Sequence, residues 1–254
     1  MEQSVGCEHI ECSIEDGVQI LRFARPEKKN AITRPMYAAL AAHLKDAGSR
    51  DDVRVTLFVG QPGAFSAGND MADFMAYAST GALGTEILDF LYALARADHP
   101  LVSAVDGLAI GVGTTLHLHC DATFASPRSH FATPFVDLAL VPEAASSLLV
   151  PKTVGHQRAF AMLAAGQPMS ARQACDAGLI LEVVDGGEVE ARAREFALAL
   201  AAKPVEALRI ARRLMRPDPE QVVAKIAEEA ELFAKQLRSK EAQAAFAAFL
   251  SRKR

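Results

Sequence analysis

The chain has 254 residues, half of them hydrophobic, and a formal net charge of −4. This length predicts one large domain, or one domain with an appendage, and the charge gives no sign of a nucleic-acid partner. Its four cysteines lack the paired spacing of a zinc site and predict free thiols in a reducing compartment. The acidic N-terminus shows no signal peptide, and no uninterrupted apolar run reaches membrane-spanning length. We therefore expect a cytoplasmic protein without a membrane partner.

The first half of the chain alternates strand-like and helix-like patterns. Two alternating apolar runs, His9–Ile14 and Val18–Phe23, flank an Asp16-Gly17 turn and predict a hairpin. A helix is predicted after Thr33, with Pro35 in its first turn, to about Ala47. Further strands are expected at Val53–Val59 and Leu101–Val105, a glycine-spaced loop at Gly60–Gly68, and a helix at Gly84–Ala97.

The second half of the chain becomes increasingly helical. The predicted elements are strands at Asp121–Ala125, Ser129–Ala132 and Leu179–Val184, an irregular loop at Thr133–Val141, and helices from Pro142 to about Val150, at Gln157–Ala165 and at Ala171–Ala177. From Glu188 only helix is expected, broken at Lys203-Pro204 and near Pro217, and amphipathic enough to pack on the core or on another subunit. The pattern predicts an α/β core over residues 1–187 and a helical region over residues 188–254.

The stretch from Asp106 to Asp121 has the strongest local signal for a functional site. An apolar strand pattern precedes it, Gly111 and Gly113 predict a turn, and an apolar helix-like run follows. A helix that starts at such a turn leaves backbone N–H groups free to hold a phosphate or a developing oxyanion. Because no carboxylate lies between Asp106 and Asp121, an acid or base for chemistry here must come from another part of the chain.

Five motifs in order give the chain a resemblance to a known family. They are RPEKKNA at Arg25–Ala31, AFSAGND at Ala64–Asp70, VDGLAIGVG at Val105–Gly113, Cys120-Asp121, and QACDAGL at Gln173–Leu179. Together they resemble the crotonase superfamily, also called the enoyl-CoA hydratase/isomerase family, over nearly the whole chain. The resemblance implies a crotonase-like spiral of ββα units, with a C-terminal helical region that builds homotrimers or hexamers.

The same resemblance implies an acyl-CoA thioester substrate, with coenzyme A present only as part of that substrate and with no separate cofactor. No metal is expected either, because on a helix His117 and Asp121 share a face while His119 points elsewhere. The resemblance assigns the amides of Asn69 and Val112 to an oxyanion hole for the thioester oxygen. The residues that it places near the coenzyme A part are Arg25, Lys28, Lys29, Ala31, Ala67, Gly68, Asp70, Gly111 and, from a neighbouring subunit, Lys253. Taken without the family, the three basic residues are a solvated loop and Asp70 is a helix cap.

The two glutamates of the family's hydratases have no counterpart in this sequence. Thr115 and Phe135 stand at their positions, and neither side chain transfers protons at neutral pH. Glu143, which follows Pro142, instead resembles the catalytic glutamate of the peroxisomal-type Δ3,Δ2-enoyl-CoA isomerase branch. That resemblance implies that Glu143 carries a proton from C2 to C4 of a 3-enoyl-CoA.

Several alternatives stay open at this point. Apolar neighbours would raise the pKa of Glu143 while a helix start at Pro142 would lower it, and a glutamate in a helix's first turn can also be purely structural. The function could instead be hydration, thioester hydrolysis or non-catalytic acyl-CoA binding. The side chains of Met71, Phe74, Met75 and Tyr77 either line an acyl pocket or pack in the core.

Overall fold

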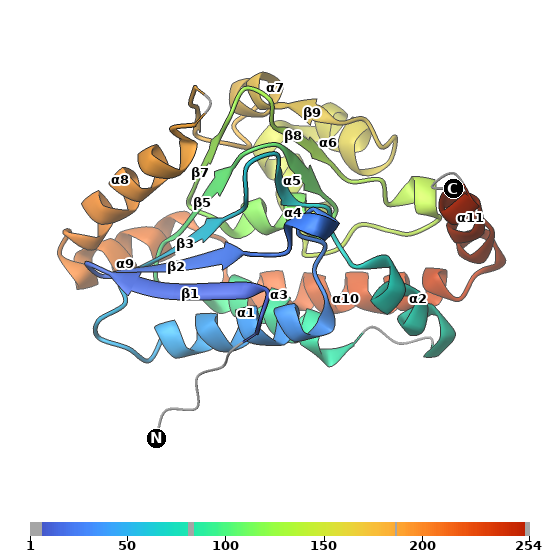
Figure 1. Cartoon of the computed structure of the whole chain (residues 1–254), viewed down its shortest axis with the longest axis horizontal. Helices are drawn as coiled ribbons and strands as arrows, with labels where there is room; N and C mark the ends of the chain where they lie inside the picture. The colour runs from blue at the N-terminus through green and yellow to red at the C-terminus, as the bar shows by residue number, and fades with distance from the viewer. Residues whose placement is uncertain (1–6, 81–83, 186, 252–254) are drawn as a thin grey trace.

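The computed structural model describes residues 7–80, 84–185 and 187–251, and its strands form two sheets (Figure 1). The first sheet has six strands in the order β1-β2-β3-β5-β7-β10, and the second has four in the order β4-β6-β8-β9. The strands are β1 Ile10–Glu15, β2 Val18–Phe23, β3 Val55–Val59, β4 Ala64–Ser66, β5 Leu101–Val105, β6 Leu108–Ile110, β7 Ala122–Ala125, β8 His130–Ala132, β9 Met169–Ser170 and β10 Glu182–Val183.

In each repeating unit of the fold, the chain passes from the first sheet to the second. The strands β3, β5 and β7 pair in parallel in the first sheet, and the strands that follow them, β4, β6 and β8, pair in parallel in the second. Each unit therefore contributes one strand to each sheet before helical residues lead to the next unit. This is the spiral of ββα units that the motifs predicted, and the hairpin β1–β2 begins it.

Helices cover both faces of the six-stranded sheet. The described α-helices are α1 Arg34–Ala47, α2 Met71–Thr80, α3 Thr85–Arg96, α4 Val112–Thr115, α5 Ser146–Val154, α6 His156–Leu163, α7 Ala171–Asp176, α8 Val189–Ala201, α9 Val205–Met215, α10 Pro219–Leu237 and α11 Lys240–Ser251. Alternate strand residues face opposite sides, so that Leu57 joins the cluster under α8 whereas Phe58 joins the larger core that contains α1 and α3. Figure 1 shows α8 on one side of this sheet and α1 and α3 on the other.

The helical region after residue 188 divides into two parts with different neighbours. α8 packs small residues, Ala193 and Ala197, directly on the six-stranded sheet. α10 and α11 instead reach α2, where the ring of Phe74 lies 5.8 Å from Phe233 and 5.4 Å from Phe246. These last helices therefore border the segment that follows Asn69. None of the helices in the described part of the chain is long and apolar enough to cross a membrane.

Some predicted boundaries were wrong for identifiable reasons. The predicted loop at Gly60–Gly68 contains the strand β4, which is too short to show an alternating pattern. The predicted strand at Leu179–Val184 is reduced to the two residues of β10. The helix expected to start at Pro142 begins at Ser146, because Ala144 and Ala145 adopt positive φ angles of 61° and 58° that an α-helix cannot contain.

Candidate active site

The two predicted oxyanion donors follow neighbouring parallel strands. β4 pairs with β6, with Ala64 opposite Leu108 and Ser66 opposite Ala109. Parallel strands end at the same edge of a sheet, so the loops that leave β4 and β6 start side by side. Asn69 lies in the first of these loops, and Val112 begins α4 at the end of the second.

Glycines allow these two loops to touch through their backbones. Gly68 has a φ of +86°, and a Cβ atom on it would lie 2.8 Å from the carbonyl oxygen of Ile110. A Cβ atom on Gly113 would similarly lie 2.8 Å from the carbonyl oxygen of Ser66. A side chain at either position would push the loops apart. Glycine at these two positions therefore permits the close approach of the loops.

The amides of Asn69 and Val112 have no hydrogen-bond acceptor among the residues that the structure describes. The nearby amides of Gly68, Asp70 and Gly111 all donate within the protein, over 3.1, 2.9 and 2.8 Å respectively. Unpaired N–H groups are rare in the interior of proteins and, in pairs, form binding sites for oxyanions. These two amides are therefore available as donors to a bound oxygen, which the role given to them by the resemblance requires.

Asn30 holds the first of these loops in place. Its side chain is fully buried and donates hydrogen bonds to the carbonyl oxygens of Ala64 (3.0 Å) and Phe65 (3.2 Å). Its own carbonyl oxygen accepts a bond from the Ser66 hydroxyl at 2.9 Å. Asn30 has a φ of +55°, a conformation that asparagine tolerates better than most residues. Sequence reasoning missed this role, and the only available signal was an asparagine at the end of a turn-rich motif.

Arg25 and Asp70, both predicted near coenzyme A, bind each other at 2.7 Å. Arg25 also donates to the carbonyl oxygen of Ala31, and the Asp70 carboxylate caps α2 by accepting from the amide of Ala72, both at 2.9 Å. Burial alone would raise the pKa of Asp70, but the bonds from Arg25 and from the helix amides lower it overall. Asp70 is thus a helix cap, as its alternative reading proposed, and Arg25 ties the basic loop to it.

Two further residues predicted near coenzyme A, Lys28 and Lys29, lie on the surface of the basic loop. The side chains of Lys28 and Lys29 are exposed, and the Lys29 carbonyl oxygen accepts a bond from the amide of Ala67 at 2.9 Å. The two lysines therefore stand beside the loop that carries Asn69. Lys253 lies outside the described residues.

Glu143 is a buried carboxylate in the irregular segment before α5. It is 7% exposed, and its Oε1 atom has no hydrogen-bond partner among the described residues. Burial raises its pKa to about 8, and the negative charge of Glu229 adds to this effect. A helix start at Pro142 was expected to lower the pKa of Glu143. This effect is absent, because α5 begins three residues after Glu143 and the first amides of that helix bind Glu229 instead. Of the two opposing influences, burial therefore prevails.

A histidine from the other half of the site holds the segment that carries Glu143. His119 ends the 3-10 helix η2 (Leu116–His119), which directly follows α4. Burial lowers its pKa to about 4, so the ring is neutral at pH 7, and its Nε2–H donates to the carbonyl oxygen of Ala144 at 2.9 Å. The segment next to Glu143 is in this way attached to the helix that begins with Val112.

Tyr37 hydrogen-bonds with the side chain of Asn69 and also lies within the electrostatic influence of Glu143. Its buried hydroxyl donates to the side-chain oxygen of Asn69 at 2.6 Å. Burial raises the pKa of Tyr37 well above its usual value, and the charge of Glu143 is the next contribution. Glu143 therefore lies near the hydroxyl that contacts Asn69. Nothing in the sequence around Tyr37 distinguished it from an ordinary core residue of α1.

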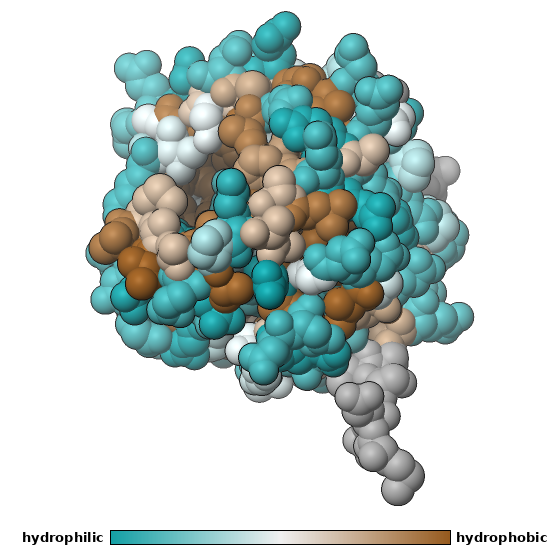
Figure 2. Space-filling view, turned by 90° about the vertical axis from the view of Figure 1, so that its left-hand side faces the viewer, coloured by the Kyte–Doolittle hydropathy of each residue, from teal (hydrophilic) through white to brown (hydrophobic). Residues whose placement is uncertain are grey.

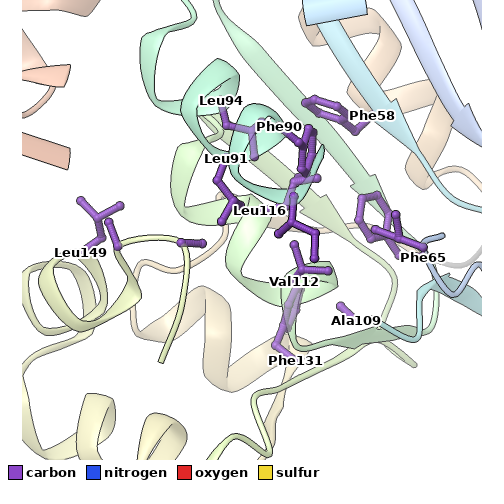
Figure 3. Close-up of a cluster of buried hydrophobic side chains, with 14 of the residues drawn as sticks. Phe58, Phe65, Phe90, Leu91, Leu94, Ala109, Val112, Leu116, Phe131 and Leu149 are labelled. Carbon is purple, nitrogen blue, oxygen red and sulfur yellow. The ribbon is translucent and has the colours of Figure 1, made fainter. Parts of the chain in front are cut away.

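The positions of the missing hydratase glutamates are buried and apolar or neutral. Thr115 stands one helical turn after Val112, and its hydroxyl has no partner among the described residues. Phe135 is 5% exposed and belongs to the main core. Figure 3 shows Val112 among hydrophobic side chains that include Leu116 and Phe131. This wall of the site thus presents no carboxylate at either position.

The histidines near the second glycine motif have structural partners. The Nδ1 atom of His117 hydrogen-bonds with the Ser103 hydroxyl at 2.9 Å, and its ring lies 4.7 Å from Phe65. Asp121 binds the guanidinium of Arg212 at 2.8 Å. Within the described ranges, no three His, Cys, Asp or Glu side chains gather as metal ligands would.

The side chains proposed for an acyl pocket differ in their surroundings. Phe74 and Tyr77 are buried in the main core, and Phe74 packs on the aromatic rings of α10 and α11. Met71 is partly buried against the same core, whereas Met75 is 45% exposed. Core packing therefore accounts for the two aromatic residues.

Comparisons with known proteins agree with this architecture. The family model described as enoyl-CoA hydratase/isomerase matches residues 13–254. Human enoyl-CoA delta isomerase 2 is 34% identical over 99% of this chain, which spans just under two thirds, 65%, of the human protein. Mouse enoyl-CoA delta isomerase 3, peroxisomal, is 35% identical over 82% of this chain and 67% of its own length.

A solved structure resembles the whole chain. The crystal structure of an enoyl-CoA hydratase/isomerase from Pseudoalteromonas atlantica T6c has a TM-score of 0.91 and 38% sequence identity, and the match covers 96% of this chain and 98% of that one. The family match, the relatives and the paired glycine loops lead to one conclusion. The chain belongs to the enoyl-CoA hydratase/isomerase family and has its crotonase spiral of ββα units with a C-terminal helical region.

Proposed function

We propose that the protein is an acyl-CoA-processing enzyme, and specifically an isomerase that converts a 3-enoyl-CoA into a 2-enoyl-CoA. One observation carries this proposal. Among the described residues, the amides of Asn69 and Val112 have no acceptor and the buried carboxylate of Glu143 has one oxygen, Oε1, without a hydrogen-bond partner, while Thr115 and Phe135 stand where the hydratase pattern has glutamates. One proton-transfer group and an oxyanion hole are sufficient for isomerisation, whereas hydration also requires activation of a water molecule.

The proposed reaction is a proton transfer in two steps. The Glu143 carboxylate takes a proton from C2, and the electron pair of that C–H bond moves onto the thioester oxygen as a dienolate forms. The amides of Asn69 and Val112 hold this oxygen, and donors of this kind contribute about 2.7–4 kcal/mol each in other enzymes. The protonated Glu143 then returns its proton at C4, and the electrons restore the carbonyl group and leave the double bond between C2 and C3.

The environment of Glu143 suits this cycle. A pKa of about 8 makes the carboxylate a stronger base than an exposed glutamate, and it also leaves the acid form accessible for the return step. Arg25, Lys28 and Lys29 lie beside the loop of Asn69 and supply positive charge for the phosphates of coenzyme A. The names of the human and mouse relatives, both enoyl-CoA delta isomerases, support the same reaction.

A rate assay with 3-enoyl-CoA thioesters of several chain lengths tests the proposal. The wild-type protein should form 2-trans-enoyl-CoA, and kcat/KM should rise with pH until about 8, because Glu143 must lose its proton to act as the base. Glu143→Gln should lower kcat about 100- to 10,000-fold with little change in KM. Glu231→Gln, which removes an exposed carboxylate, should leave both parameters unchanged.

The products distinguish the alternative functions. Formation of hydroxyacyl-CoA would identify a hydratase, and release of free coenzyme A would identify a thioester hydrolase. Tight binding of acyl-CoA without turnover at any chain length would identify a binding subunit. A wild-type rate in Glu143→Gln would show that another group moves the proton.

We also propose a homotrimer, or a hexamer made of two trimers, assembled partly through α9. The exposed apolar residues of this helix include Leu214 and Met215, which are 79% and 80% exposed. Figure 2 shows hydrophobic patches among hydrophilic residues on the side of the molecule that carries α8 and α9. Exposed apolar surface of this kind favours a contact between chains.

The mass in solution tests this assembly. Analytical ultracentrifugation of the wild-type protein should give three or six times the 27.1 kDa chain mass. Leu214→Glu should shift the distribution towards monomers, whereas Glu206→Gln, on an exposed polar position of the same helix, should not. A monomeric wild-type protein would rule the proposal out.

A further inference from the structure

One buried carboxylate outside the proposed proton-transfer step binds the segment that directly follows Glu143. Glu229 lies within α10, is 5% exposed, and binds the start of α5. Its Oε2 atom accepts a hydrogen bond from the amide of Ala145 at 2.6 Å. Its Oε1 atom accepts from the amide and the hydroxyl of Ser147 at 2.9 and 2.5 Å. More than eighty residues of chain separate the two partners.

The segment that Glu229 binds needs an external support. Ala144 and Ala145 both have positive φ angles, which are unfavourable for any residue that carries a Cβ atom. Two such residues in succession do not persist without contacts that over-determine them. Glu229 supplies these contacts on one side through the amide of Ala145, and His119 supplies them on the other through the carbonyl oxygen of Ala144. Glu143 is the residue immediately before this turn.

Few ionisable groups surround Glu143 in the part of the chain that the structure describes. Tyr37 approaches from α1, and His119 from η2 carries no charge at pH 7. Glu229 approaches from α10, where Lys225 acts on it in turn, and Arg212 of α9 acts on His119. Burial and then the charge of Glu229 raise the pKa of Glu143.

We propose that Glu229 is a positioning residue for the proton transfer: from the C-terminal helical region it clamps the Ala144–Ala145 turn and fixes where the Glu143 carboxylate stands. The inference rests on the proposed isomerase function. It gives α10 a role within the active site of its own chain, in addition to any role in assembly.

Two substitutions separate the geometric effect of Glu229 from its electrostatic effect. Glu229→Gln keeps the length of the side chain but removes the charge and turns one acceptor atom into a donor that faces an N–H group. It should lower kcat/KM about 10- to 100-fold and move the rise of kcat/KM towards lower pH, because the anion that raises the pKa of Glu143 is gone. Glu229→Asp keeps the charge but shortens the reach, so the rate should fall while the pH of the rise stays near that of the wild-type protein.

The control is Glu231→Gln, which removes an exposed carboxylate from the same helix and should change neither quantity. Thermal melting checks the folding of every variant. Should Glu229→Gln fail to fold, Ser147→Ala removes one of the three donors to Glu229 and leaves both amide bonds. A lower kcat in Ser147→Ala supports the proposal, and a wild-type kcat overturns it.

The outcomes also separate this inference from the proposed function. A wild-type protein that does not isomerise 3-enoyl-CoA would defeat the function, and the positioning role with it. An active wild-type protein that loses its activity in Glu143→Gln, but keeps both its rate and its pH profile in Glu229→Gln, would overturn the positioning role alone.

Discussion

The two halves of the proposed active site are built in different ways. The oxyanion half consists of backbone amides on loops that leave paired strands, and glycines bring these loops into contact. The base half is one side chain on an irregular segment whose two alanines adopt a conformation typical of glycine. Groups from η2 and α10 hold that segment. Strand pairing and glycine contacts thus bring the two donor loops together, with Asn30 holding the first of them, while side chains from η2 and α10 hold the segment of the proposed base.

This difference explains where the chemistry of the fold can change. The donors at Asn69 and Val112 are main-chain groups, so a substitution of their own side chains leaves the N–H groups in place. The proton-transfer group has no such protection. In this chain, Thr115 and Phe135 stand where the hydratase pattern has carboxylates, and the proposed base, Glu143, lies on another segment. Under the proposed function, the choice of reaction therefore depends on side chains, while the oxyanion donors belong to the backbone.

The largest effect is expected from a substitution that separates the two oxyanion loops. Gly68→Ala places a Cβ atom 2.8 Å from the carbonyl oxygen of Ile110, on a backbone with a φ of +86°. The loops must move apart, and the amide of Asn69 then no longer points at the same oxygen as that of Val112. We expect kcat to fall about 100- to 1,000-fold, the loss seen when one oxyanion donor is removed.

Gly63→Ala is the matched control for this experiment. Gly63 also has a positive φ, of +92°, but a Cβ atom on it would meet nothing within 4 Å. Gly63→Ala should therefore lower the free energy of unfolding only through backbone strain, by about 1–2 kcal/mol, while kcat stays near the wild-type value. Equal losses of kcat in both variants would show that strain, and not the approach of the loops, is responsible.

A smaller effect, on stability, is expected from the base half. The pKa of Glu143 is about 8 in the folded chain against 4.5 in its ordinary state, so between these values the folded protein binds more protons than the unfolded one. Stability must therefore fall as pH rises through this window. Because Glu143→Gln cannot ionise, the wild-type protein should lose about 2–3 kcal/mol more than this variant between pH 6 and pH 9.

Urea denaturation of both proteins at the two pH values measures this difference. Glu231→Gln, with its exposed carboxylate, should follow the wild-type curve. If the free energy of unfolding changes equally with pH in the wild-type protein and in Glu143→Gln, then Glu143 is hydrated in solution. The base half would then lack the buried carboxylate that distinguishes it from the donor half.

Sequence reasoning was most successful where a local pattern determines the structure. The hairpin around Asp16-Gly17, the helix α1 after Thr33 and the strand β5 agree with their predictions to within one residue. The glycine motif that ends at Gly113 also predicted the turn before α4, because a backbone position with no room for a side chain requires glycine. The family itself was identified from motifs of this kind.

The sequence was least informative where the structure depends on contacts between distant segments. The start of α5 was misplaced because Ala144 and Ala145 adopt positive φ angles, and this turn is bound by Glu229, which lies more than eighty residues away. Tyr37 hydrogen-bonds with Asn69 from a separate helix, and no local sequence pattern predicts that bond. Long-range pairs of this kind depend on the complete tertiary structure, which a single sequence does not display.

The packing of α10 against the site has a consequence for the order of events during synthesis. During synthesis, the segments that carry Asn69, Val112 and Glu143 emerge from the ribosome well before α10. The spiral core can begin to fold at that stage. Until Glu229 and Phe233 arrive, the turn beside Glu143 and the aromatic contact on α2 lack their partners. Under the proposal for Glu229, a nascent chain gains catalytic competence only after α10 has docked, so that unfinished chains do not act on thioesters.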